Sequence, residues 1–169
     1  MVLCFLSLIA SNLRELENDV TKKINQRAIE EKVKLIDKFY KKIIGLRPKI
    51  GVVGLNPHCE STNKFNEDDF ILKPTIKSLK KSNIKISGPH SADTCFIKQN
   101  RDKFDVIIGM YHDQVLTPIK TIHNFDAINI TLGLPYLRIS PDHGTNNQML
   151  GKNKSNPKSL ISAIKFLTN

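Results

Sequence analysis

The chain has 169 residues, 40% of them hydrophobic and 25% charged, which is enough to bury one sizeable core. The net charge of +10 favours anionic partners such as phosphorylated metabolites, although a lysine-rich solvated surface explains most of it. No arginine-rich arm or recognition motif is present, so a nucleic-acid-binding module is the least favoured class. The three cysteines have no paired spacing, which indicates a reducing cytoplasm rather than a disulfide framework.

The first ten residues are apolar, but a membrane span needs roughly 20 residues, so no anchor or signal peptide is expected. This run is either a buried strand or the start of a chain whose beginning lies further upstream. Residues 12–44 then carry apolar side chains at helical spacing, and Gly45 and Pro48 end the pattern. We therefore expect a helical segment over residues 1–44.

Residues 45–169 alternate between strand-like and helix-like patterns. Residues 49–55 and 105–110 are nearly unbroken apolar runs, typical of strands buried on both faces of a sheet. Shorter strands are expected at 84–87 and 127–131, and helices at 67–81, 92–103, 113–122 and 157–167, with Pro74 and Pro118 interrupting two of them. The alternation predicts an α/β domain with a mostly parallel sheet and helices on both faces.

Two histidines follow the two buried strands. His58 comes after the first strand, and His112, with Asp113 beside it, comes after the second. Ligands bind outside the carboxyl ends of parallel strands, so both side chains are expected in one crevice. Neutral imidazole is a common metal ligand that a carboxylate can orient, but two hydrogen-bonded structural histidines explain the pattern equally well.

Three further polar residues lie downstream of the second histidine. Lys120, Asn129 and Arg138 combine two cations with a neutral amide, and an arginine can hold a carboxylate or phosphate through paired hydrogen bonds. The alternative is two surface cations and one strand-end amide, and for Lys120 alone this alternative is favoured.

Five short strings occur in a fixed order along the chain: GLNPH (54–58), ADT (92–94), MYHDQ (110–114), NITLGLP (129–135) and DHGT (142–145). Together they closely resemble the 4-hydroxythreonine-4-phosphate dehydrogenase family, which makes a precursor of the pyridoxal phosphate ring. The resemblance covers roughly residue 45 to the end. It implies an isocitrate/isopropylmalate-dehydrogenase-like fold.

The resemblance implies NAD- or NADP-dependent oxidation of the secondary alcohol of 4-phosphooxy-L-threonine, then loss of carbon dioxide to give an amino-ketone phosphate. In this family a divalent metal (zinc, magnesium or cobalt) held by three histidines polarises the reacting oxygen. His58 and His112 match two of these ligands, and His112 and Asp113 are the expected catalytic residues. Lys120, Asn129 and Arg138 match substrate-binding positions. The family is a cytoplasmic homodimer with its site at the subunit interface.

The sequence departs from the family at its amino-terminal end. The third metal histidine belongs near Ala10 to Arg14, yet no histidine precedes His58, and neither alanine nor arginine can replace it. His90 is an extra histidine, expected at the surface or at a helix entry. The family's large amino-terminal portion is also absent, so we expect the carboxyl-terminal half of the enzyme.

We therefore expect little or no dehydrogenase activity from this chain alone. Two interpretations stay open: pairing with a separately encoded amino-terminal half, and a non-catalytic dimerising fragment or remnant. Related dehydrogenases act on other four-carbon phosphorylated hydroxy acids, and the sequence does not separate these substrates.

Overall fold

The computed structural model describes residues 4–7, 24–59, 66–144 and 147–168. The chain forms two compact units, residues 1–116 and residues 117–169. Within the described ranges, no helix is both long enough and apolar enough to cross a membrane. These two units are defined by the packing of the chain. The division expected from the sequence, into residues 1–44 and 45–169, stays a prediction.

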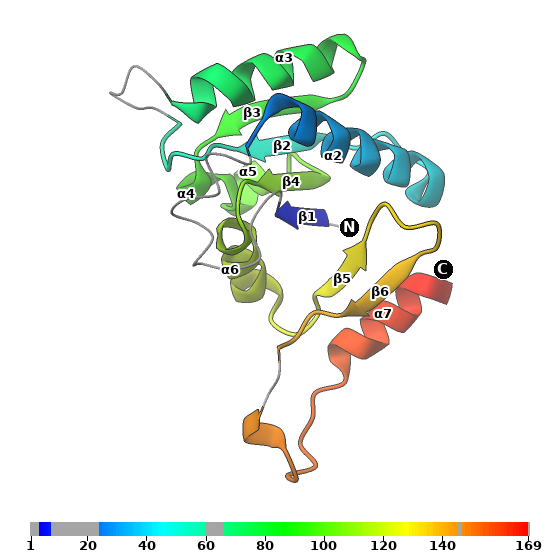
Figure 1. Ribbon diagram of the computed structural model, residues 1–169. Helices are drawn as coiled ribbons and strands as arrows, with labels where there is room; N and C mark the ends of the chain where they lie inside the picture. The colour runs from blue at the N-terminus through cyan, green and yellow to red at the C-terminus, as the bar shows by residue number, and fades with distance from the viewer. Residues whose placement is uncertain (1–3, 8–23, 60–65, 145–146, 169) are drawn as a thin grey trace. The chain divides into compact units, whose positions relative to one another are not determined.

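A parallel sheet of four strands forms the centre of the first unit, in the order β1-β4-β2-β3 (Figure 1). The strands are β1 (Cys4–Ser7), β2 (Ile50–Val53), β3 (Ile86–His90) and β4 (Val106–Gly109). Every residue of the two central strands, β2 and β4, is buried, which explains why both are unbroken apolar runs. The predicted α/β fold with a parallel sheet is confirmed, and the apolar run at the start of the chain contributes a strand.

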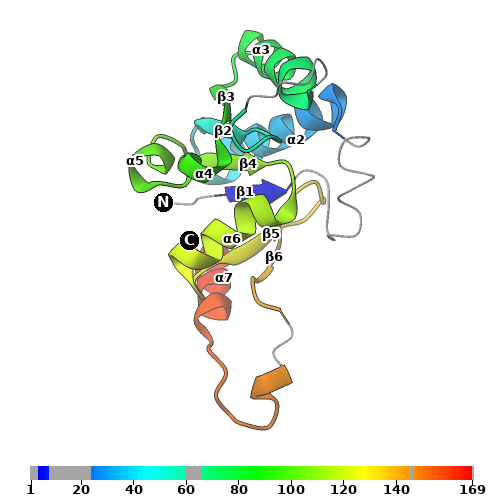
Figure 2. The same cartoon turned by 90° about the vertical axis from the view of Figure 1, so that its left-hand side faces the viewer.

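Helices lie on both sides of this sheet. They are α2 (Gln26–Phe39), a π-helical turn η2 (Tyr40–Ile44), a second π-helical turn η3 (Asp68–Leu72), α3 (Lys73–Lys81), α4 (Ala92–Cys95) and α5 (Lys98–Arg101). Figure 2 shows α2 and α5 on opposite sides of the strands. Helix α2 begins where the Asn25 side chain accepts a hydrogen bond from the backbone N–H of Ala28, a typical N-cap. Its buried stripe is Ile29, Val33, Ile36 and Phe39.

Two expected helices are divided in the structure. Residues 67–81 form η3 and then α3, with Pro74 in the first turn of α3, where a missing N–H costs little. Residues 92–103, predicted as one helix, form two short helices because the backbone of Ile97 is extended. Side chains of α5 then replace the lost helical bonds: Arg101 donates to the Phe96 carbonyl oxygen and Asn100 donates to that of Thr94.

The second unit is smaller and less regular. Helix α6 (His112–His123) runs through Pro118 and crosses from the first unit into the second. It is followed by β5 (Ile128–Thr131), β6 (Arg138–Pro141), a short 3-10 helix η4 (Asn147–Met149) and α7 (Lys158–Thr168). β5 and β6 form a two-stranded antiparallel sheet, and α7 packs against both strands (Figure 1).

Candidate functional site

One buried carboxylate holds the loop that leads from β2 to His58. Asp68 is fully buried and accepts hydrogen bonds from the backbone N–H of Leu55 (2.7 Å) and of Asn56 (3.0 Å). The side-chain amide of Asn56 donates to the same carboxylate (3.0 Å). Three donors compensate a carboxylate for its removal from water, so this loop has a fixed path. No sequence pattern indicated this role, because Asp68 lies in a run that predicts an ordinary helix.

The loops after β2 and β3 are joined directly. The carbonyl oxygen of Pro57 accepts hydrogen bonds from the Ser91 hydroxyl (2.7 Å) and from the backbone N–H of Ala92 (3.1 Å). The backbone N–H of Gly54 donates to the carbonyl oxygen of His90 (2.9 Å). The segment before His58 is therefore fixed from two sides, by η3 and by the start of α4.

Gln114 connects the ends of the two central strands. Its side-chain oxygen accepts the backbone N–H of Met110, just after β4, and its side-chain N–H donates to the carbonyl oxygen of Gly54, just after β2; both distances are 2.7 Å. Gln114 is only 7% exposed. A buried amide whose oxygen and N–H group both have partners holds these partners in one geometry. It thus sets the spacing between the strand ends that lead to the two candidate histidines.

His58 lies beside a carboxylate from the next loop. Its Nδ1 is 3.9 Å from Asp93 Oδ2, and both side chains are largely exposed. The Ser91 hydroxyl donates to Asp93 Oδ1 (2.8 Å), and this hydrogen bond is the main reason that the pKa of Asp93 is lowered, with a smaller contribution from His58. The ionised carboxylate is therefore available to orient the imidazole ring.

His112 is oriented by its neighbour in the sequence. Its Nδ1 lies 2.8 Å from Asp113 Oδ1, and both side chains are about half exposed. Because a carboxylate only accepts hydrogen bonds, Nδ1 carries the proton in this contact. A neutral ring then keeps the lone pair of Nε2 for another partner, which is the arrangement usual for a metal-bound histidine.

Imidazole and carboxylate groups such as those of His58 and His112 and their neighbours are suitable ligands for a divalent cation. Too few of them come together, however, to form a complete metal site. Within residues 4–7, 24–59, 66–144 and 147–168, no three His, Cys, Asp or Glu side chains come together in a way that could hold a metal ion. A catalytic zinc site has three protein ligands as a rule. The place expected for the missing third ligand, between Ala10 and Arg14, lies outside the described residues.

In the second unit, the strand register puts two of the predicted substrate residues on one face. Thr131 pairs with Arg138 and Asn129 pairs with Ser140, so all four side chains point to the same side of the two-stranded sheet. Asn129 and Arg138 are both exposed. Arg138 begins β6 and donates to the Thr131 hydroxyl (2.8 Å). This face therefore presents an amide and a guanidinium side by side.

Lys120 differs from that pair because it already has a partner. Its ammonium group forms an ion pair with Asp142 (2.9 Å) and also contacts the Asp142 backbone carbonyl oxygen. The backbone N–H of Asp142 donates to the buried Ser159 hydroxyl (2.9 Å), which itself donates to the carbonyl oxygen of Ala127. Ser159 therefore helps to place the carboxylate that holds Lys120, and no sequence signal singled it out.

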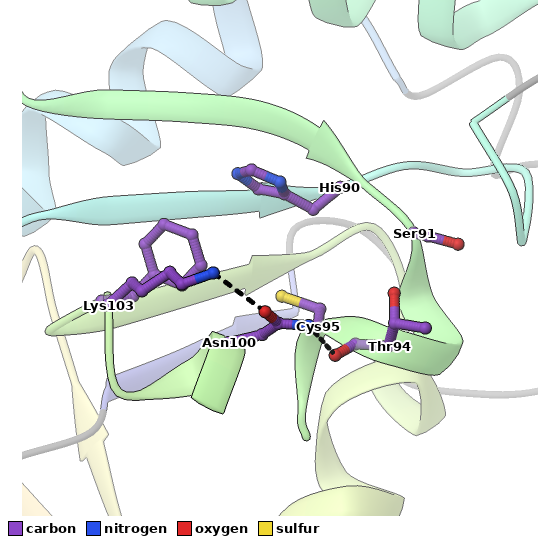
Figure 3. A pocket seen from close by; sticks show the side chains of 7 residues that line it. His90, Ser91, Thr94, Cys95, Asn100 and Lys103 are labelled. Atoms are coloured by element: carbon purple, nitrogen blue, oxygen red, sulfur yellow. Dashed lines mark hydrogen bonds between the residues drawn. The ribbon is translucent and has the colours of Figure 1, made fainter. Parts of the chain in front are cut away.

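His90 lines a separate small hollow of about 150 Å³ between β3 and α5 (Figure 3). Its ring packs on Phe104, with 5.1 Å between ring centroids, and its Nε2 is 2.9 Å from the Ser87 hydroxyl. Burial, and then the charges of Lys103 and Lys80, lower the pKa of His90. Neither His58 nor His112 lines this hollow, so His90 serves local packing at the end of β3.

Comparison with known proteins decides the family. A family model described as "Pyridoxal phosphate biosynthetic protein PdxA" matches residues 14–167. The chain belongs to the PdxA family. It is 45% identical over 151 residues to the 4-hydroxythreonine-4-phosphate dehydrogenase of Sulfurihydrogenibium sp., covering 88% of this chain and 46% of that protein. It is 41% identical to the Bradyrhizobium diazoefficiens enzyme of the same name, over 88% of this chain and 44% of that protein.

Two further matches are a relative that carries a different enzyme name and a solved structure. A D-threonate 4-phosphate dehydrogenase from Pectobacterium atrosepticum is 32% identical, over 85% of this chain and 44% of that protein. A crystal structure of 4-hydroxythreonine-4-phosphate dehydrogenase from Klebsiella pneumoniae superposes with a TM-score of 0.79 at 28% identity, over 98% of this chain and 50% of that one. The chain thus spans about half the length of the PdxA relatives that it matches.

Proposed function

We propose that this chain supplies the carboxyl-terminal half of a PdxA-type dehydrogenase. The reaction is the NAD- or NADP-dependent, metal-assisted oxidation and decarboxylation of 4-phosphooxy-L-threonine to an amino-ketone phosphate, in the cytoplasmic synthesis of pyridoxal phosphate. The observation that carries the proposal is Gln114, which ties together the strand ends that lead to His58 and His112 in a PdxA-family chain.

Each predicted residue has a role that its surroundings support. His58 and His112 would hold a zinc, magnesium or cobalt ion; Asp113 is hydrogen-bonded to the ring of His112, and Asp93 lies 3.9 Å from that of His58. When bound, such an ion supplies Lewis-acid polarisation of the reacting oxygen, while NAD(P) accepts the hydride. Asp113 is also close enough to the ring of His112 to receive a proton from it.

The second unit supplies groups for an anionic substrate. Arg138 offers a planar pair of donors for a carboxylate or phosphate, and Asn129 offers a neutral amide on the same face. Lys120 brings a cation whose charge Asp142 partly compensates. The net charge of +10 attracts phosphorylated ligands to the molecule as a whole.

The isolated chain is expected to be a poor catalyst. The described residues bring no three metal donors together, and the chain spans about half of its relatives. The active form we propose is a homodimer of the completed PdxA fold, with the site at the interface. The other half belongs either to a longer form of this chain or to a separate polypeptide. A non-catalytic fragment or remnant is the competing interpretation.

Metal titration tests the proposed histidine pair. Isothermal titration with Zn²⁺ or Co²⁺ should show weak binding to the wild-type chain, because two ligands hold a metal less tightly than three. His112→Ala should abolish this binding. His90→Gln is the matched control, since it removes a histidine from a different place and should leave the metal affinity unchanged. Equal affinities in all three proteins would contradict the proposal.

Turnover tests the reaction itself. The chain is assayed with 4-phosphooxy-L-threonine or D-threonate 4-phosphate, NAD or NADP, and a divalent metal, following NAD(P)H formation. We expect no measurable turnover alone, and turnover once the missing half of a relative is supplied. D-threonate 4-phosphate is the second candidate substrate because one relative carries that name. Ordinary enzyme rates from the chain alone would show that it is not an incomplete enzyme.

A further inference from the structure

Arg138 is held by a neutral partner. Its guanidinium donates through Nη1 to the Thr131 hydroxyl (2.8 Å), and among the described residues it forms no ion pair with a carboxylate. It is the only arginine of residues 117–169. Because a hydroxyl carries no charge, this hydrogen bond orients the guanidinium and leaves its positive charge uncompensated. Lys120 in the same unit differs, since Asp142 partly compensates its charge.

The strand register makes this contact a fixed feature of the β5–β6 sheet. Thr131 is the last residue of β5 and pairs directly with Arg138, two strands that lie side by side in Figure 1. The Cβ atoms of directly paired residues are about 4.5–5.5 Å apart on one face of the sheet. Threonine is β-branched, which restricts its χ1 angle and so the position of its hydroxyl. A stiff acceptor therefore holds a long and flexible arginine side chain.

The hydrogen bond to Thr131 uses Nη1 of the guanidinium and no other nitrogen. Nε and Nη2 of Arg138 have no hydrogen-bond partner among the described residues. The N–H groups of Nε and Nη2 point in parallel from one edge of the planar group, and this edge matches two oxygens of a carboxylate or a phosphate. Asn129 adds an amide on the same face of the sheet. The remaining edge of the guanidinium is therefore the one suited to an oxyanion.

The competing explanation is that Thr131 only stabilises the pairing of the two strands. Arg138 is exposed, and an exposed hydrogen bond replaces one with water, so it adds little to the free energy of unfolding. Its effect on binding is larger, because a ligand that immobilises a free arginine side chain must first overcome its rotamer entropy. A side chain that is already ordered loses less entropy when the ligand binds. The contact is thus better suited to binding than to folding.

We propose that Thr131 is a positioning residue for substrate binding, which holds the Arg138 guanidinium so that Nε and Nη2 bind an oxyanion of the substrate, carboxylate or phosphate. This inference rests on the proposed function, which assigns a substrate to Arg138. Thr131 itself touches no reacting atom. Its loss weakens the binding of the oxyanion without changing the chemical step, so KM rises while kcat stays the same.

The first measurement needs no catalysis and uses the whole chain. NMR of the Arg138 side chain gives the rate of rotation about its Nε–Cζ bond, which a hydrogen bond to Nη1 slows. Thr131→Val keeps nearly the shape and the strand preference of threonine but removes the acceptor. We expect rotation to be about two- to tenfold faster in Thr131→Val, the equivalent of one hydrogen bond. Thr131→Ser keeps the hydroxyl and should restore the wild-type rate.

The second measurement follows the Arg138 Nε–H signal while inorganic phosphate or acetate is added. Either anion should shift this signal in the wild-type chain, and the tighter of the two identifies the substrate group that Arg138 binds. Thr131→Val should raise the dissociation constant about two- to tenfold, because the anion must now order the side chain itself. Thr121→Val is the matched control: it removes an exposed hydroxyl that donates to its own helix, and it should change neither rotation nor affinity.

Three results would overturn the inference. They are an unchanged rotation rate in Thr131→Val, a faster rotation with unchanged affinity for the anion, and no response of Arg138 to either anion. Failure of the proposed function has a different signature. The completed enzyme would then show no turnover, although Thr131→Val still weakens anion binding. Turnover with equal KM in Thr131→Val and wild type would leave the proposed function intact and contradict the inference.

Discussion

The Gln114 side chain donates a hydrogen bond to the carbonyl oxygen of Gly54 over 2.7 Å, although the two residues are 60 positions apart in the sequence. The same side chain accepts the backbone N–H of Met110. This single buried amide therefore joins the carboxyl ends of β2 and β4. The loops that begin there carry His58 and His112, so the geometry of the loop before His58 depends on a residue that is a sequence neighbour of His112.

Gln114→Glu should destabilise the fold. The new side chain keeps an acceptor for Met110 but turns an ionised oxygen toward the carbonyl oxygen of Gly54, so a buried hydrogen bond is replaced by repulsion. We expect the free energy of unfolding to fall by about 1–3 kcal/mol, measured by urea denaturation. Gln99→Glu, on an exposed position of α5, should change it by less than about 0.5 kcal/mol. Equal losses of unfolding free energy from the two substitutions would show that the hydrogen bonds of Gln114 to Met110 and Gly54 do not stabilise the fold.

Asp68→Asn should loosen the loop before His58. The amide has one oxygen in place of two, and its N–H₂ group meets donors from Leu55 and Asn56 that need an acceptor. A loss of about 1–3 kcal/mol in the free energy of unfolding is expected. The neighbouring Asp69→Asn should cost clearly less, because Asp69 is exposed. Proteolysis between Leu55 and Cys59 should be faster in Asp68→Asn only. Unchanged proteolysis in this variant would contradict the role of Asp68 in holding the loop before His58.

His90 should make the fold less stable at acidic pH. The folded protein holds the pKa of His90 below 6.5, through burial first and then the charges of Lys103 and Lys80. Below pH 6.5 the unfolded chain takes up a proton that the folded chain resists, so stability is full above this pH and is lost as pH falls toward the folded pKa. Urea midpoints at pH about 7.5 and about 5.5 should therefore differ less in His90→Gln than in wild type. The exposed His143→Gln should behave as wild type does.

Cys95 should be an unreactive thiol in the folded protein. Burial raises the pKa of Cys95 to about 11. At pH about 8, roughly one thiol in a thousand is then ionised, against about a quarter of ordinary cysteines, and only the thiolate reacts. Alkylation of the Cys95 peptide by iodoacetamide, followed by mass spectrometry, should be roughly 100-fold slower in buffer than in concentrated urea. Similar rates in both conditions would show that Cys95 is accessible and ionised in the fold.

The strand predictions were accurate where burial on both faces forced a continuous apolar run. This condition holds for β2 and β4, which are buried as expected and take the two central positions of the sheet. The helix expected over residues 92–103 was wrong as a single element. The helix breaks at Ile97, and side chains of α5 donate to the carbonyl oxygens of Thr94 and Phe96, bonds that no hydrophobic pattern shows.

The sequence by itself determined the family, the alternation of strands and helices, and the positions of His58 and His112 directly after two buried strands. These features are local, because hydrophobic periodicity and short motifs are properties of neighbouring residues. Only the tertiary structure decided that Asp68 and Gln114 fix the loops before the histidines. These features depend on which distant groups meet, since a buried polar atom takes its partner from wherever the fold brings one within reach.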